Sequence, residues 1–331
     1  MINEEVMAVS DEGKGDPRER LNESIRRGLG ATCLAALEDP AVEELMLNPD
    51  GKLWIYKVGV GMIDTGQTLR PAQALNVMNT IASMLDRTVT ADNPILEGEL
   101  PLDGSRFEGV IPPASAGPLF SIRKHAQFVY TLEDYVQAGI LSLAYYTAIL
   151  EAVRTRKNIL VVGSTASGKT TLLNAVIAAI AKHTPDHRVV IIEDTGEVQC
   201  TAENKVILQT SRTVTMLDLL KATMRLRPDR IIVGEVRGPE ANALLKAWNT
   251  GHPGGVATIH ANDCMGGLIR VEQLIQEAVA VVNPQVIASA VDMVIFIKKG
   301  EISGKRRVEQ VALVERYDAA AHQYVLRDVQ E

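Results

Sequence analysis

The stretch VVGSTASGKTTLLNAV, residues 161–176, decides how the rest of the chain is interpreted. Within it, GSTASGKT (163–170) fits the pattern G-x-x-x-x-G-K-[ST], follows a Val-rich run and precedes a helical pattern. Two glycines permit a tight loop whose backbone N–H groups point inward at an anion, and the helix N-terminus adds the positive end of its dipole. The sequence therefore predicts a phosphate-binding loop between a strand and a helix.

The residue types in this loop predict ATP and Mg²⁺ as ligands. In such a loop Lys169 supplies a mobile cation to the β- and γ-phosphates, and the hydroxyl of Thr170 is a ligand for Mg²⁺. The alternative, a glycine-rich turn with a surface lysine, is disfavoured by the strand–loop–helix context. The predicted nucleotide-binding residues are Gly163, Ser164, Thr165, Ala166, Ser167, Gly168, Lys169, Thr170 and Thr171.

Strand-like and helical patterns alternate in the C-terminal part of the chain. The expected strands are 158–163, 188–193, 230–235 and 255–260, and the helices begin at Lys169 or span 215–226, 239–249 and 265–280. Continuous Val/Ile runs that alternate with helices are typical of a buried, mainly parallel sheet. We therefore predict an α/β P-loop NTPase domain over 143–331.

The N-terminal part has a different rhythm. Helical patterns over 17–37 and 71–86 alternate with strand-like runs over 42–48, 52–63 and 119–125, and 90–117 is rich in Pro and Gly. We predict a smaller α+β domain over 18–130, a linker over 131–142 and a disordered tail over 1–17.

Composition excludes several classes of protein. The 331 residues carry a net charge of −7 and only 4% are aromatic, which argues against a protein that coats DNA or RNA. The N-terminus is acidic without an apolar core, and the most apolar run, 278–297, is interrupted by polar residues and a proline, so we expect a soluble cytoplasmic protein. Three distant cysteines form no C-x-x-C pair and are expected to be small buried hydrophobic residues.

Acidic side chains end two of the expected strands. RIIVGE ends in Glu235, which is placed to act beside Mg²⁺ through a bound water molecule. In IIEDTGE the strand ends at Glu193, which is placed to orient the water that attacks the phosphate. A single glutamate in such a position is often a helix cap or a solvated terminus. Two of them in one sheet with a phosphate loop favour a catalytic role.

A histidine ends a further strand. TGHPGGVATIHAND (250–263) places His260 at the end of its strand, where an imidazole that hydrogen-bonds a phosphate oxygen would sense the γ-phosphate. Structural packing is the alternative, and His252 is expected only to hold the turn. Two histidines without nearby cysteines are weak evidence for a metal.

Together, GSTASGKT, IIEDTGE, LRPDRIIVGEVRGPEA and GHPGGVATIHAN resemble, in this order, the Walker A, Asp, Walker B and His boxes of the secretion-ATPase superfamily. This superfamily contains the motors of type II and type IV secretion, type IV pili and conjugation. The resemblance covers about residues 40–325, and KATMRLRPDRIIVGEVRG is similar to the conjugal-transfer branch. It implies a RecA-like C-terminal engine.

The resemblance also implies an assembly and further site residues. It implies a homo-hexameric ring at the inner face of the membrane, attached peripherally to inner-membrane components of a conjugation or type IV secretion complex. It implies that Arg106 and Arg123 reach the phosphates, where a guanidinium accelerates phosphoryl transfer. Arg237, directly after Glu235, is a weaker candidate for a residue that faces a neighbouring subunit.

The leading hypothesis is therefore an ATP-hydrolysing motor that drives pilus assembly or substrate transfer. Its alternatives are a pilus-retraction ATPase, a RecA-like DNA translocase, and a nucleotide-gated assembly switch with little turnover. No sequence-specific binding of nucleic acid is expected. The basic cluster 304–307 lies outside the matched boxes, and a solvated hairpin turn is favoured there over contact with lipid or a partner.

Overall fold

The computed structural model describes residues 16–125, 129–211, 213–300 and 305–330. The chain divides into two compact units, residues 1–125 and 126–331, which are described separately below. Most of the expected tail 1–17 lies outside the described residues, and the first helix begins at Pro17.

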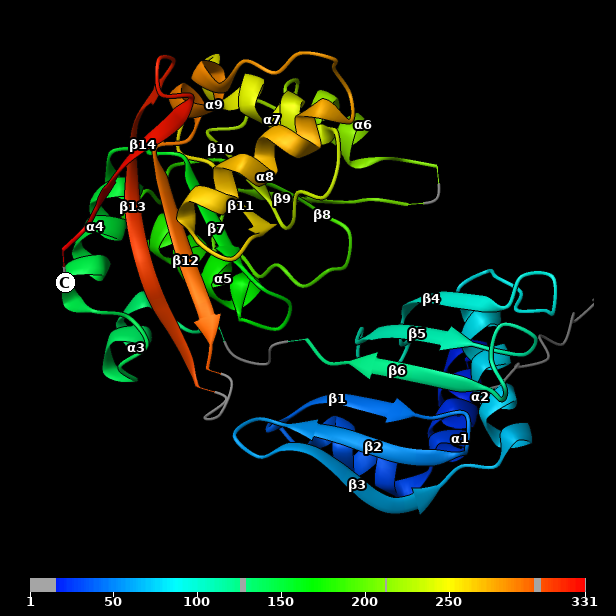
Figure 1. Ribbon diagram of the computed structural model, residues 1–331. Helices are drawn as coiled ribbons and strands as arrows, with labels where there is room; N and C mark the ends of the chain where they lie inside the picture. Colours follow the sequence, from blue (N-terminus) through cyan, green and yellow to red (C-terminus); the bar gives the residue numbers. More distant parts are fainter. Residues whose placement is uncertain (1–15, 126–128, 212, 301–304, 331) are drawn as a thin grey trace, which may run out of the picture. The chain divides into compact units, whose positions relative to one another are not determined.

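Unit 1 is an antiparallel sheet covered on one face by two helices (Figure 1). The strand order is β3-β2-β1-β6-β5-β4. The strands are β1 (Val42–Leu47), β2 (Lys52–Lys57), β3 (Gly61–Thr68), β4 (Ile95–Glu99), β5 (Arg106–Val110) and β6 (Leu119–Arg123), and the helices are α1 (Pro17–Glu38) and α2 (Pro71–Met84).

Local chemistry explains where α1 begins and bends. Asp16 caps the helix, because its carboxylate accepts a hydrogen bond of 2.9 Å from the backbone N–H of Arg18, and Pro17 occupies the first turn. Gly30 interrupts the helix with a φ of +78°, a left-handed conformation that glycine adopts without strain.

Two segments of unit 1 differ from the secondary structure expected from the sequence. The run 52–63, expected as one strand, turns at residues 58–60 and forms β2 and the start of β3, because Gly59 and Gly61 have positive φ angles. The Pro- and Gly-rich stretch 90–117 contains β4 and β5, whose Leu96 and Phe107 are buried in the core. Burial on one face outweighed the turn-rich composition.

Unit 2 contains an eight-stranded mixed sheet in the order β14-β13-β12-β7-β11-β10-β8-β9. The strands from β12 to β9 along this order are parallel, whereas β13 and β14 pair antiparallel at one edge. The strands are β7 (Ile159–Gly163), β8 (Val189–Glu193), β9 (Lys205–Gln209), β10 (Arg230–Val233), β11 (Val256–His260), β12 (Met293–Lys299), β13 (Arg306–Asp318) and β14 (Gln323–Asp328).

Helices cover both faces of this sheet (Figure 1). One apolar cluster joins the sheet to α3, α4 and α5, and a second joins it to the other four helices. The expected α/β fold, a RecA-like domain after a smaller α+β unit, is confirmed. The helices are α3 (Leu132–Gln137), α4 (Leu143–Arg154), α5 (Lys169–His183), α6 (Met216–Thr223), α7 (Glu240–Asn249), α8 (Cys264–Gln276) and α9 (Pro284–Ala290).

The segment 131–142, expected as a linker, contains α3. Thr131 caps this helix in a reciprocal capping box with Asp134, and Leu132 and Tyr135 are buried against α4 and α5. The segment therefore belongs to the core of unit 2, because its apolar side chains pack there.

The three cysteines, Cys33, Cys200 and Cys264, are free and buried, as expected for small hydrophobic residues. Within the described residues, no helix has the length and apolar character needed to cross a membrane. The tail beyond Lys299 adds β13 and β14 to the sheet, and part of the basic cluster 304–307 lies outside the described residues.

Candidate nucleotide site

The predicted phosphate loop connects β7 to α5 in unit 2. All five residues of β7 are buried, whereas residues 164–166 are exposed. Ala166 and Gly168 have φ angles of +57° and +97°, so the backbone turns sharply before the first turn of α5. Consecutive amide groups in such a turn, at the N-terminus of a fifteen-residue helix, form a concave anion-binding surface.

Gly163 is required by close packing at the start of this loop. A Cβ atom at Gly163 would lie 2.5 Å from both the carbonyl oxygen of Ile297 and the hydroxyl of Ser167. Ser167 itself is fully buried beneath the loop. The pattern of the motif therefore reflects packing against β12 as well as the approach of a phosphate.

Lys169 lies over the loop that it follows. Its side chain is buried, and its ammonium group donates hydrogen bonds to the carbonyl of Ser164 (3.0 Å) and to Nδ1 of His260 (3.2 Å). A buried ammonium group is stabilised by an anionic partner, and the amides of such a loop also bind anions. Lys169 and the loop together therefore suit the phosphates of a nucleotide.

A chain of charged contacts links Lys169 to the ends of the neighbouring strands. Nε2 of His260 lies 2.7 Å from Oε1 of Glu235, whose other oxygen accepts a hydrogen bond of 2.8 Å from Arg237. Arg237 also lies 3.6 Å from Asp194. Since the carboxyl ends of parallel strands meet at one edge of a sheet, residues distant in sequence converge here.

The contacts define the charge state of this chain. Burial and the nearby Lys169 hold the pKa of His260 below its ordinary value of 6.5, so Nδ1 accepts from Lys169 while Nε2 faces Glu235. Burial opposes the charge of Glu235, but Arg237, His260 and Lys169 outweigh it and lower the pKa of that carboxyl. Glu235 is therefore ionised at neutral pH, and its charge is balanced by its neighbours.

Glu193 has a different environment from Glu235. It is only 3% exposed, and one of its oxygens accepts a hydrogen bond of 2.8 Å from the backbone N–H of Val198. This bond ties the end of β8 to the loop that carries Asp194, and Asn174 on α5 accepts a bond from Gln199 in the same loop. Sequence reasoning missed Asn174, because a buried asparagine inside a helical pattern carries no local signal.

Buried polar residues also hold the turn before β11. The side-chain oxygen of Asn158 accepts hydrogen bonds from the backbone N–H groups of Gly254 and Gly255, at 2.7 and 3.0 Å. Arg230 is fully buried and donates to the carbonyl of Gly254, to that of Val153 and to His187. These bonds fix the start of the strand that ends at His260.

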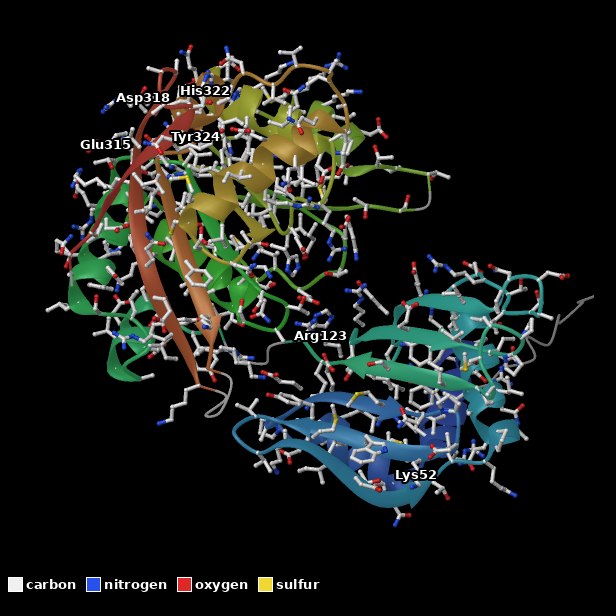
Figure 2. All side chains as sticks on the ribbon, viewed as in Figure 1. Lys52, Arg123, Glu315, Asp318, His322 and Tyr324 are labelled. Carbon is white, nitrogen blue, oxygen red and sulfur yellow. The ribbon has the colours of Figure 1, made fainter. Side chains whose placement is uncertain are left out.

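Arg106 and Arg123 lie in unit 1, at the ends of β5 and β6, and Figure 2 labels Arg123. They are direct partners in the antiparallel register, so their side chains share one face of the sheet. Glu44 and Glu99 complete this row of four charged residues, and Nε of Arg123 lies 3.9 Å from the carboxylate of Glu44. Their contact with phosphates stays a prediction.

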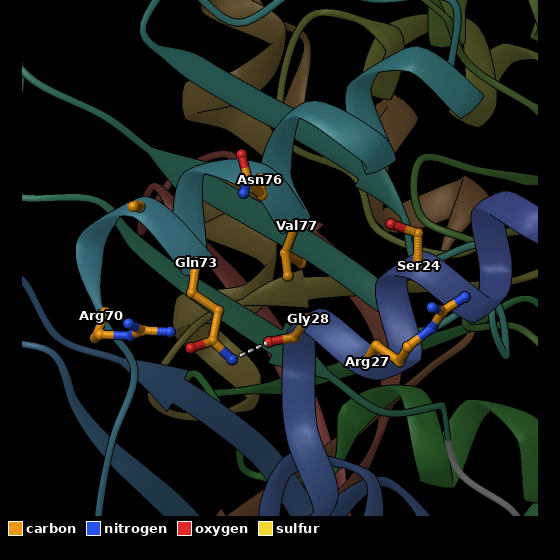
Figure 3. Close-up of a pocket in the computed structure, with 8 residues that line it drawn as sticks. Ser24, Arg27, Gly28, Arg70, Gln73, Asn76 and Val77 are labelled. Carbon is orange, nitrogen blue, oxygen red and sulfur yellow. Dashed lines mark hydrogen bonds between the residues drawn. The ribbon is translucent and has the colours of Figure 1, made fainter.

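A pocket of about 440 Å³ lies in unit 1 where α1 and α2 meet (Figure 3). Gln73 donates a hydrogen bond to the carbonyl of Gly28, and Val77 packs so close to Gly28 that a larger residue would clash. The predicted nucleotide-binding residues do not line this pocket, whose lining is Ser24, Arg27, Gly28, Arg70, Ala72, Gln73, Asn76 and Val77.

The oxygen ligands near the phosphate loop suit a metal ion that binds together with a nucleotide. Within the residues that the structure describes, no group of three His, Cys, Asp or Glu side chains is arranged to hold a metal ion. Mg²⁺ is commonly held by one or two protein oxygens together with substrate phosphates and water. The Thr170 hydroxyl at the start of α5 and the ionised Glu235 fit that mode of binding.

The sheet, the phosphate loop and the strand-end residues define a P-loop NTPase domain of the RecA-like class. The family model of the type II/IV secretion system protein matches residues 58–322. The chain therefore belongs to the type II/IV secretion system protein family.

Curated relatives and solved structures agree with this assignment. The conjugal transfer protein TrbB of Rhizobium radiobacter is 50% identical over 299 residues, which cover 90% of this chain and 91% of the relative. VirB11 of the type IV secretion system of Bartonella henselae is 28% identical, over 83% of this chain and 89% of its own length. Both relatives are therefore matched over almost their whole length.

Two solved structures share the fold. The pilus retraction motor PilT with bound ADP has a TM-score of 0.62 at 18% identity, over 96% of this chain and 84% of that one. The ATPase DotB of Legionella pneumophila has a TM-score of 0.61 at 18% identity, over 87% and 80%.

Proposed function

We propose that this protein is an ATPase that hydrolyses Mg·ATP and acts as a motor of a conjugation or type IV secretion system. The observation that carries the proposal is the convergence of Lys169, His260 and Glu235 from three separate segments into one chain of contacts beside the phosphate loop. The relatives' names, conjugal transfer protein and type IV secretion system protein, support the biological setting.

Residues 163–171 hold the phosphates of ATP. Their backbone amides and the Lys169 ammonium supply the positive charge, and Thr170, with Glu235 acting through water, holds Mg²⁺. When bound, Mg²⁺ neutralises the charge that develops on the transferred phosphoryl group.

Glu235 is the carboxylate best placed to orient water at the γ-phosphate, because it is ionised and lies at the edge of the sheet beside Lys169 and His260. Glu193, expected to orient water, acts in this proposal as a positioning residue, because its carboxylate holds the loop after β8. His260 senses the γ-phosphate: once Lys169 turns to the phosphates, Nδ1 of His260 takes up a proton from water and donates a hydrogen bond to a phosphate oxygen.

Arg106 and Arg123 act as a pair from the N-terminal unit. Because the two residues are direct partners on one face of the sheet, both guanidinium groups can contact the same anion. A guanidinium at the transferred phosphoryl group stabilises the transition state, and its release after hydrolysis couples chemistry to domain movement. The motor assembles as a homo-hexamer and is attached to inner-membrane components from the cytoplasmic side.

The deciding experiment is specific ATPase activity as a function of protein concentration, with Lys169→Ala as the inactive control. We expect the activity per subunit to rise and then saturate, because hydrolysis by the proposed ring motor requires assembly. Flat activity down to nanomolar protein would contradict the ring mechanism. Stimulation by DNA would favour the translocase, and no activity above the control at any concentration would favour the nucleotide-gated switch.

A further inference from the structure

The hairpin of β12 and β13 passes directly behind the phosphate loop. β12 pairs in parallel with β7, so Ile295 and Phe296 lie beside Val161 and Val162. A Cβ atom at Gly168 would lie 2.9 Å from Cδ and 3.2 Å from Nε of Arg306, the first residue of β13. The Arg306 side chain therefore packs against the last glycine of the loop.

The direction of the Arg306 side chain follows from the register of β13. Residues 306 and 308 point to the same face of a strand, and Val308 is fully buried in the cluster that contains α3 and α5. Its N–H also bonds the carbonyl of Ile140, which anchors the strand start. Arg307 points to the opposite face and is exposed.

The charge of Arg306 lies close to this packed region. Burial raises the pKa of Tyr135 on α3, and the Arg306 charge opposes that rise. A guanidinium packed against Gly168 adds to the positive potential that the dipole of α5 and the ammonium of Lys169 supply at this end of the helix. A bound phosphate gains from that added potential.

We propose that Arg306 is a positioning residue of the phosphate loop and that its charge raises the affinity for nucleoside di- and triphosphates. Its stem packs on Gly168, and its guanidinium strengthens the positive potential at the anion-binding end of α5. This inference rests on the proposed nucleotide binding and concerns affinity rather than the chemical step.

The test uses the full chain and three substitutions at position 306 with one matched control. Arg306→Met keeps an aliphatic stem without charge, Arg306→Ala removes both, and Arg306→Lys keeps the charge. Arg307→Ala removes the adjacent exposed arginine. The measurements are the Kd for Mg·ADP by calorimetry and the KM and kcat for ATP.

We expect Arg306→Met and Arg306→Ala to raise the Kd for Mg·ADP and the KM for ATP by roughly tenfold, with kcat changed by less than about twofold. Arg306→Lys recovers part of the affinity, and Arg307→Ala matches the wild type. Because the effect is electrostatic, the difference between Arg306→Met and wild type narrows as salt rises from about 0.1 to 1 M.

The outcomes separate this inference from the proposed function. If the wild type binds no Mg·ADP, the proposed function and the role of Arg306 are both contradicted. If the wild type binds and Arg306→Met binds equally well, or the difference does not change with salt, only the role of Arg306 is overturned. Thermal unfolding without nucleotide identifies a variant that misfolds, and Arg306→Gln, which is also uncharged, then replaces it: a Kd for Mg·ADP well above that of Arg307→Ala supports the role, and an equal Kd overturns it.

Discussion

At the scale of single residues, His260 lies between the ammonium of Lys169 and the carboxylate of Glu235, and these two neighbours shift its pKa in opposite directions. Lys169 lowers the pKa of His260 and Glu235 raises it, while burial is the largest influence and lowers it. Because the pKa in the folded chain is below 6.5, the neutral imidazole favours folding above about pH 6.5. That contribution is lost as the pH falls through the folded-state pKa.

Substitution of either neighbour is expected to shift the titration of His260 in opposite directions. Lys169→Met raises the pKa of His260, because it removes a nearby positive charge, and Glu235→Gln lowers it further, because it removes the compensating negative charge. NMR of the imidazole protons against pH, in nucleotide-free protein, measures both shifts. Shifts of the same sign in the two variants would contradict the contacts that link the three side chains.

At the scale of elements, the connection from β10 to α7 positions Arg237. Glu240, in the first turn of α7, is buried, and one of its oxygens accepts hydrogen bonds from the backbone N–H groups of Arg237 (2.8 Å) and Gly238 (2.9 Å). This carboxylate closes the loop and directs Arg237 toward Glu235 and Asp194. A carboxylate in the first turn of a helix thereby orders the preceding loop, which carries a residue of the site.

Glu240→Ala is expected to lower the free energy of unfolding by about 1–3 kcal/mol, because two backbone donors lose their acceptor. We expect kcat for ATP to fall by about tenfold as Arg237 loses its position, a change equivalent to about 1.4 kcal/mol. Glu240→Gln keeps an oxygen at the same place and is the control for both measurements. Equal losses of stability and of kcat in the Gln and Ala variants would contradict the role of the Glu240 oxygen as the acceptor that holds this loop.

At the scale of the whole molecule, each apolar core is formed inside one unit. The cluster around Phe107 and Phe120, whose rings lie 5.6 Å apart, contains residues of unit 1, and the two clusters around the eight-stranded sheet contain residues of unit 2. Separate cores predict separate unfolding transitions, since cooperativity follows shared packing.

Phe107→Ala is expected to destabilise unit 1 by about 3–5 kcal/mol, because it leaves a cavity at a fully buried position. Calorimetry should show one transition lowered and the other unchanged. Leu173→Ala, fully buried in unit 2, is the reciprocal variant, and Mg·ADP should raise only the transition that Leu173→Ala lowers. A single transition that both substitutions shift equally would contradict two independent cores.

Much of the candidate site could be predicted because its signals are local. The phosphate loop consists of consecutive residues, and Glu235 and His260 follow strands whose Val/Ile runs are legible in the sequence. Parallel pairing then brings their carboxyl ends together. The position of Arg306 against Gly168 had no such local signal, because it depends on the pairing of strands more than a hundred residues after the phosphate loop.

The sequence by itself determined the α/β class, the phosphate loop and the strands that carry the acidic and histidine residues, because periodicity and motif spacing are properties of neighbouring residues. Only the tertiary structure decided that residues 131–142 pack into a core, that Glu193 holds a loop, and that Arg306 lies behind Gly168. These features depend on burial and on contacts between distant segments, which no local pattern encodes.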